Sequence, residues 1–123
     1  MFQKMFENVR TKNPLIHNIT NYVTVNDCAN ITIACGAAPI MADDSEEVEE
    51  ITSLCAGLNI NIGTLNSRTI TAMLLAGKRA NEQNHPVVLD PVGAGASRPV
   101  SYTHLDVYKR QLHIRRGPRT VGS

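Results

Sequence analysis

The stretch His85-Pro-Val-Val-Leu-Asp-Pro-Val-Gly-Ala-Gly-Ala-Ser97 decides the fold class, because an apolar run ends there in an acid and then in a glycine-rich turn. The apolar run predicts a buried strand, and α/β proteins bind ligands beyond the carboxyl ends of parallel strands. Backbone N–H groups in a glycine turn form a concave surface that accepts anions. We therefore expect an α/β fold with Asp90 and the Gly93–Gly95 turn at a ligand-binding edge.

The segments before this stretch alternate between strand and helix patterns. Leu58, Ile60 and Ile62 alternate with two asparagines, which is the period of a strand with one buried face. Residues 66–83 have apolar side chains at helical spacing, and residues 38–41 form a further short apolar strand. The order β-α-β-α-β with short connections predicts a parallel sheet with right-handed crossovers.

The first third of the chain predicts helices. A short amphipathic helix begins at Phe2 and is interrupted at Asn13-Pro14. The polar run 17–21 follows a brief apolar segment and is predicted to lead into a helix over 23–35, which Gly36 can terminate. Asp44 and Glu47 have the spacing of a capping box for a helix that reaches residue 54.

The predicted topology brings three strand ends to one edge of the sheet. The ends are Met41-Ala42, Gly63-Thr64 and Asp90-Pro91. Consecutive parallel strands have their carboxyl ends on the same side, so we expect a ligand cleft along this edge.

Each candidate site residue has a functional and a structural interpretation. Asp90 either binds Mg²⁺ or its waters, or hydrogen-bonds the following turn. Gly93 and Gly95 either cradle a phosphate or form an ordinary turn, since the spacing is neither a dinucleotide fingerprint nor a Walker loop. Met41 is either an apolar wall for a ring-containing substrate or a core residue.

The polar run and the acidic cluster carry the same ambiguity. Asn18 and Asn21 either orient a polar ligand atom or cap a helix, and His17 is either a proton carrier or a structural histidine. Residues 43–50 contain six acids, which suit a solvated helix amino terminus better than a metal site.

The composition predicts a cytoplasmic protein of one modest domain, with no membrane span and no secretory signal. The cysteines are Cys28, Cys35 and Cys55, an odd number without paired spacing, so neither a disulfide framework nor a zinc site is expected. Residues 1–97 contain ten acids and six Lys or Arg, whereas residues 98–123 contain one acid and six Lys or Arg. The two parts therefore differ in charge balance.

The basic tail has a simpler explanation than a nucleic-acid arm. Residues 100–111, Val-Ser-Tyr-Thr-His-Leu-Asp-Val-Tyr-Lys-Arg-Gln, resemble a translated sequencing adaptor derived from a transposon end. Residues 112–123 have no apolar periodicity. We therefore expect residues 98–123 to be a non-native, disordered tail, and we predict no nucleic-acid partner.

Four motifs, taken together and in order, carry a family resemblance. They are Asn13-Pro-Leu-Ile-His-Asn-Ile-Thr-Asn21, Gly36-Ala-Ala-Pro-Ile-Met-Ala42, Leu58-Asn-Ile-Asn-Ile-Gly-Thr64 and Leu89-Asp-Pro-Val-Gly-Ala-Gly-Ala96. With these motifs, residues 1–97 closely resemble the amino-terminal part of the hydroxyethylthiazole kinase family. The resemblance implies a ribokinase-like α/β fold and transfer of the ATP γ-phosphoryl group to the primary alcohol of 4-methyl-5-(2-hydroxyethyl)thiazole, a salvage step toward thiamine.

The resemblance also implies roles for individual residues. Met41 matches the methionine that contacts the thiazole, Asn21 and Gly63 fall in motifs that line the same pocket, and Asp90 matches an acid near Mg²⁺ and the phosphates. The family forms homotrimers with pockets between subunits. Its catalytic cysteine, its glycine-rich anion hole and most of its ATP site match nothing in residues 1–97. We therefore assign no catalytic residue and expect the chain alone to be inactive.

Two other functions remain open at this stage. One is a short α/β protein that binds a nucleotide or a small molecule without chemistry. The other is a ribokinase-like kinase that acts on a different small alcohol.

Overall fold

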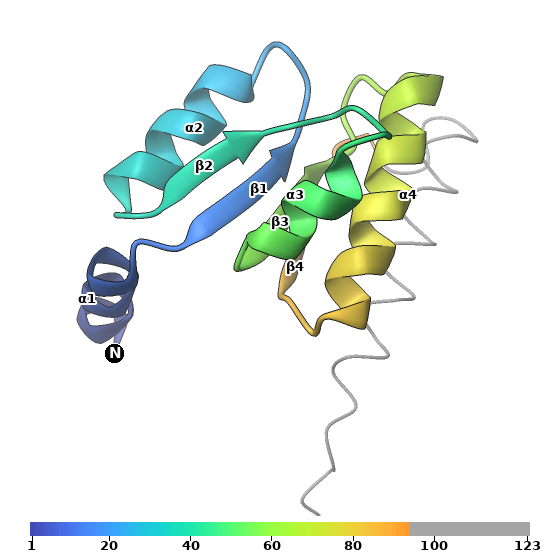
Figure 1. Ribbon diagram of the computed structural model, residues 1–123. Helices are drawn as coiled ribbons and strands as arrows, with labels where there is room; N and C mark the ends of the chain where they lie inside the picture. Colours follow the sequence, from blue (N-terminus) through green and yellow to red (C-terminus); the bar gives the residue numbers. More distant parts are fainter. Residues whose placement is uncertain (94–123) are drawn as a thin grey trace, which may run out of the picture.

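The computed structural model describes residues 1–93, and the predicted tail and Gly95 lie outside the described residues. It is an α/β arrangement in which helices and parallel strands alternate along the chain (Figure 1). The elements in chain order are α1 (Phe2–Lys12), β1 (Leu15–Ile19), α2 (Val25–Ala34), β2 (Ala38–Met41), α3 (Val48–Leu54), β3 (Gly57–Asn61), α4 (Ser67–Glu82) and β4 (Val87–Asp90). The predicted fold class is confirmed.

The four described strands form one parallel sheet in the order β2-β1-β3-β4. The sequence analysis missed β1, because it assigned residues 17–21 to a helix entrance. The strand is nevertheless central, and its polar side chains are buried with partners: Asn18 accepts a hydrogen bond from Asn59 Nδ2 at 3.0 Å. A buried strand tolerates polar residues when each one is hydrogen-bonded, and hydrophobic periodicity does not detect this situation.

The helix boundaries follow from local capping. The predicted capping box at Asp44 is wrong: Asp44 Oδ1 accepts from Glu46 N at 2.9 Å and closes a turn, and α3 begins later, at Val48, without a side-chain cap. A capping box exists instead at α4, where Asn66 Oδ1 accepts from Thr69 N at 2.9 Å and Thr69 Oγ1 accepts from Asn66 N at 3.2 Å. Gly36 has a φ of 95°, as a helix-terminating glycine requires.

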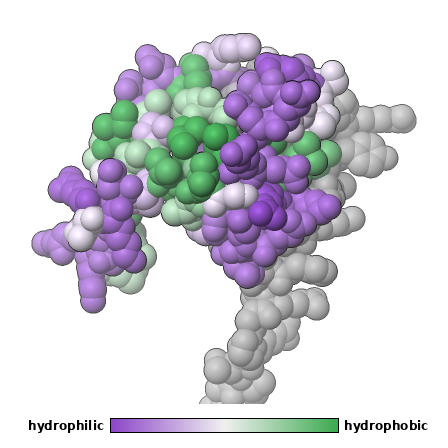
Figure 2. All heavy atoms as spheres, viewed as in Figure 1, coloured by the Kyte–Doolittle hydropathy of each residue, from purple (hydrophilic) through white to green (hydrophobic). Residues whose placement is uncertain are grey.

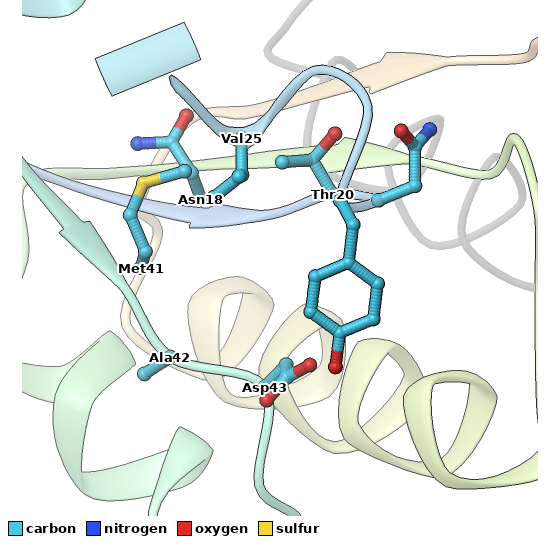
Figure 3. Close-up of a pocket in the computed structure, with 8 residues that line it drawn as sticks. Asn18, Thr20, Val25, Met41, Ala42 and Asp43 are labelled. Carbon is cyan, nitrogen blue, oxygen red and sulfur yellow. The ribbon is translucent and has the colours of Figure 1, made fainter.

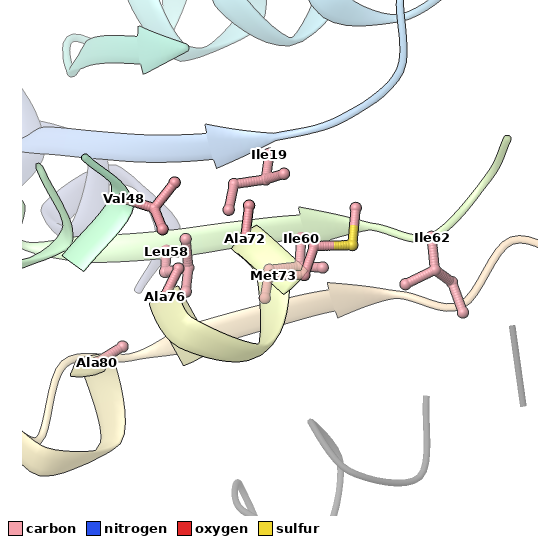
Figure 4. Packing of buried hydrophobic residues seen from close by; sticks show 9 residues of the cluster. All are labelled: Ile19, Val48, Leu58, Ile60, Ile62, Ala72, Met73, Ala76 and Ala80. Atoms are coloured by element: carbon pink, nitrogen blue, oxygen red, sulfur yellow. The ribbon is translucent and has the colours of Figure 1, made fainter. Parts of the chain in front are cut away.

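The hydrophobic core lies between one face of the sheet and the helices α3 and α4 (Figure 4). Ile19, Leu58 and Ile60 point to this face, and each is at most 2% exposed. The helices contribute Val48, Ala72, Met73, Ala76 and Ala80 to the same cluster. The alternation predicted for residues 58–62 therefore separates a dry face from a polar one.

The opposite face is only partly covered. Side chains at alternate strand positions point to it, among them Asn59, Asn61 and Val88, and the Val88 side chain is 63% exposed. Helix α2 packs against β2. Figure 2 shows the face seen in Figure 1, where hydrophobic residues gather near the centre and hydrophilic residues lie on both sides of them. On this face β4 therefore leaves Val88 and Asp90 exposed, whereas Asn61 on β3 is buried.

Candidate functional site

The carboxyl ends of the strands meet at one edge, as the sequence analysis predicted. Asn18 is in register with Met41 on one side and with Asn59 on the other, and Asn61 is in register with Asp90. Because β1 lies between β2 and β3, Met41 and Asp90 stand at opposite ends of this edge. The residues between them come from β1, β3 and the loops that follow.

Three cavities open along this edge, with volumes of about 170, 370 and 160 Å³. Asn21 lines all three, and it is the first residue of the turn that leads from β1 to α2. Gly63 lines the second and third cavities. The structure therefore brings Asn21 and Gly63 together.

The first cavity has an apolar wall and polar rims (Figure 3). In the close-up, Met41 and Val25 lie beside Asn18, while Asp43 stands at the opposite side of the space. The Met41 side chain is about one-third exposed, at 36%, so it is not a core residue in the described part of the chain. A flexible thioether beside a valine forms a surface suited to a small apolar ring.

Amide side chains connect the cavities to the sheet. Asn21 Oδ1 accepts hydrogen bonds from Val23 N at 3.0 Å and from Thr24 N at 3.1 Å, which holds the loop after β1. Its Nδ2 lies 3.4 Å from both Asn61 Oδ1 and the Gly63 carbonyl oxygen. Asn21 therefore orders the turn before α2 and faces the end of β3 at the same time.

Asp90 lies at the end of β4 and is exposed, with one carboxylate oxygen held. Asn61 Nδ2 donates to Asp90 Oδ2 at 2.9 Å. The Asp90 carboxylate is therefore accessible at the end of β4.

The two described glycines at this edge have different reasons to be glycine. Gly93 has a φ of 67°, a conformation that side chains rarely adopt. At Gly63 a Cβ atom would stand 3.1 Å from Asn61 Oδ1 and 3.2 Å from Val92 Cγ1. Gly63 therefore permits a close approach of three segments, and Gly93 permits the turn after Asp90.

His17 is a structural histidine with both ring nitrogens occupied. Nε2 lies 2.8 Å from the Ala42 carbonyl oxygen, which can only accept, so Nε2 carries the proton. Nδ1 then accepts from Thr52 Oγ1 at 2.8 Å. Burial lowers the pKa of His17, although the Ala42 hydrogen bond and the Glu47 carboxylate act in the opposite direction. His17 therefore fixes the backbone next to Met41 rather than carrying protons.

The acidic cluster forms a solvated surface. Asp43 pairs with Arg68, with 3.2 Å between Oδ2 and Nη2, and both side chains are more than one-third exposed. Within residues 1–93 no group of three or more His, Cys, Asp or Glu side chains is arranged to hold a metal ion. Cys28 and Cys35 are half-buried and Cys55 is buried, and burial raises the pKa of the Cys55 thiol. None of the three cysteines lines the cavities at the strand-end edge.

Sequence reasoning missed two contributors to the site. The sequence pattern indicates Asn61 only as a polar position of an alternating strand, whereas in the structure it contacts Asn21, Gly63 and Asp90. Tyr22 lines the first and third cavities. Two asparagines at alternate positions of one strand, directly before Gly63, were the available signal, because amides on one face of a sheet end can bond to one another.

Fold and site together define an α/β protein of the kind that binds small molecules at the carboxyl edge of a parallel sheet. No helix among the described residues combines the length and the apolar character needed to cross a membrane.

The chain belongs to the hydroxyethylthiazole kinase family, whose sequence model matches residues 6–120. It is 74% identical over 98 residues to the hydroxyethylthiazole kinase of Clostridium acetobutylicum, a match that covers 80% of this chain and 36% of that protein. The hydroxyethylthiazole kinase of Methanocella arvoryzae is 60% identical over 90 residues, covering 73% of this chain and 34% of that protein.

A solved structure described as a hydroxyethylthiazole kinase protein from Pyrococcus horikoshii OT3 matches with a TM-score of 0.83 and 45% identity. The match covers 87% of this chain and 42% of that one. Of the two curated relatives named above, the chain spans about a third of the length.

Proposed function

We propose that this chain is the amino-terminal part of a hydroxyethylthiazole kinase, which transfers the ATP γ-phosphoryl group to the primary alcohol of 4-methyl-5-(2-hydroxyethyl)thiazole in thiamine salvage. The observation that carries the proposal is the set of three cavities that share Asn21 at the strand-end edge, the first of which is lined by Met41. Family membership supplies the reaction class. The thiazole ring is assigned to the apolar wall formed by Met41 and Val25.

In this proposal the polar residues orient the alcohol and the phosphates. Asn21 lines all three cavities, and Gly63 lines the second and the third. Asp90 lies beyond Asn61 on the same edge. The backbone at Gly93, and at Gly95 beyond the described residues, belongs to the phosphate side. Phosphoryl transfer depends mainly on such positioning and on charge stabilisation.

The described residues offer one carboxylate, Asp90, as a ligand for Mg²⁺. Mg²⁺ keeps several waters and is held in kinases by one or two carboxylates together with substrate phosphates, so a single accessible carboxylate is compatible with it. Asp90 is that carboxylate, and residues 1–93 contain no group of three or more His, Cys, Asp or Glu side chains that could hold the ion. When bound, the ion would neutralise charge on the transferring phosphoryl group.

Several properties of the intact protein are part of the same proposal. We assign it to the cytoplasm, with ATP as co-substrate and a homotrimer as its assembly. We also propose that residues 1–97 are the native part and that residues 98–123 are not. The chain as it stands is expected to be inactive, because the family's cysteine and anion hole match nothing in residues 1–97.

A chimera tests the proposal. It joins residues 1–97 of this chain to the carboxyl-terminal remainder of the Clostridium acetobutylicum relative, to which the chain is 74% identical over 98 residues. We expect ATP-dependent phosphorylation of the thiazole alcohol that exceeds turnover of other small primary alcohols, and no turnover by the 123-residue chain. A folded chimera that binds thiazole without turning it over, or that prefers another alcohol, contradicts the proposal.

A further inference from the structure

Asn61 uses both ends of its amide at the site edge. Its Oδ1 accepts from Gly63 N at 2.9 Å and lies 3.4 Å from Asn21 Nδ2. Its Nδ2 donates to Asp90 Oδ2 at 2.9 Å. The residue is only 7% exposed, so these contacts are sheltered from water.

The topology explains why an amide is needed at this position. β3 and β4 are paired with Asn61 opposite Asp90, so the two side chains leave the same face of the sheet as neighbours. Asparagine offers one acceptor and two donors on a short side chain. A carboxylate here would face Asp90 with like charge, and an aliphatic side chain would leave the Gly63 N–H without this acceptor.

Asp90 depends on this contact for its orientation. Asp90 is exposed at the end of β4. Within residues 1–93, its carboxylate accepts a side-chain hydrogen bond from Asn61. An exposed aspartate without such a bond samples several rotamers. Asn61 bonds to one of the two carboxylate oxygens, Oδ2.

We propose that Asn61 is a positioning residue that holds the Asp90 carboxylate and the Gly63 turn in one arrangement. This arrangement would place the phosphate-bound metal next to the substrate alcohol. This inference rests on the proposed kinase function. Asn61 touches neither substrate nor metal in this role and acts through Asp90. Groups that orient a metal-ligating carboxylate typically change affinity or activity about 10–100-fold when they are replaced.

The test compares Asn61→Leu with Asn59→Leu in the chimera. Asn59 lies on the same strand and face, and its Nδ2 bonds to Asn18 at 3.0 Å rather than to Asp90, so it is the matched control. We expect Asn61→Leu to weaken Mn²⁺ binding, measured by electron paramagnetic resonance with ADP present, about 10-fold, and to lower kcat about 10–100-fold. The Mn²⁺ affinity of Asn59→Leu should change far less.

A double-mutant cycle decides whether Asn61 acts through Asp90. The loss from Asn61→Leu should nearly vanish in a chimera that already carries Asp90→Asn, because the group being positioned is gone.

If Asn61→Leu does not fold, Asn61→Ser replaces it, since a hydroxyl cannot span both partners. Additive effects, or equal Mn²⁺ affinities for the Asn61 and Asn59 variants, overturn the inference. An unsubstituted chimera that binds Mn²⁺ but phosphorylates no thiazole refutes the function instead, and the Mn²⁺ comparison still decides the role of Asn61.

Discussion

The two faces of the sheet are built from the same strands but follow different chemistry. On the face toward α3 and α4, Ile19, Leu58 and Ile60 pack into a core that is closed to water. On the other face, Asn59 donates a hydrogen bond to Asn18, and Asn61 donates one to an exposed Asp90. The comparison teaches that apolar burial on one face provides the rigid support for a polar, accessible edge on the other. Each prediction below tests this division by measuring the stability of variants of the chimera.

The largest effect is expected from a cavity in the core face. Ile60 is fully buried, so Ile60→Ala should lower the free energy of unfolding by about 2–5 kcal/mol. Val88→Ala on the other face is the control, since that side chain is 63% exposed, and its cost should stay within about 0.5 kcal/mol. Urea midpoints measure both. Similar losses for the two variants would show that both faces are packed equally in the complete protein.

Two glycines of β3 and its exit sharpen the comparison at the site edge. Gly63→Ala should cost about 1–3 kcal/mol, because the new Cβ would crowd Asn61 Oδ1 and Val92 Cγ1. Gly57→Ala meets its nearest atoms at 3.5 Å, which is ordinary contact, and should be neutral or stabilising by about 0.4–1 kcal/mol. A thermal unfolding series measures the pair. The prediction fails if Gly63→Ala is as stable as the parent and binds thiazole normally.

The helix that covers the core face begins with a capping box that can be removed. Asn66→Ala should cost about 1 kcal/mol, since the Thr69 N–H loses its side-chain acceptor. Asp44→Ala is the matched control, because Asp44 closes a turn and does not cap α3. Its effect should stay within about 0.5 kcal/mol. Equal losses measured by urea unfolding would show that the turn before α3 contributes as much as a true cap.

The smallest effect at neutral pH concerns His17, the polar exception on the core face. Burial lowers its pKa below 6.5, so the unfolded chain binds a proton more readily than the folded one. Stability from this group is complete above about pH 6.5 and declines as the pH falls toward the lowered value of the folded state. His17→Gln should remove this part of the pH dependence. Unfolding free energies between pH 8 and pH 5 measure it, and parallel curves for the two proteins would contradict the prediction.

Much of the fold could be predicted from local pattern. The alternation at residues 58–62 and the helical spacing at 66–83 gave β3 and α4 nearly at their observed bounds. The central strand β1 could not be predicted in this way, because His17 and Asn18 break the apolar pattern and find their partners 25 or more residues away. Asp44 shows a different error. Its spacing to Glu47 is that of a capping box, but its side chain accepts from Glu46 N and closes a turn instead of capping α3.

The sequence by itself determined the fold class, the family and the strand ends that carry Met41, Gly63 and Asp90, because these depend on short-range periodicity and on ordered motifs. Only the tertiary structure decided that β1 separates β2 from β3, that His17 is occupied at both nitrogens, and that Asn61 joins Asn21, Gly63 and Asp90. The physical reason is that hydrogen bonds between side chains far apart in the chain depend on strand register, which local sequence does not encode.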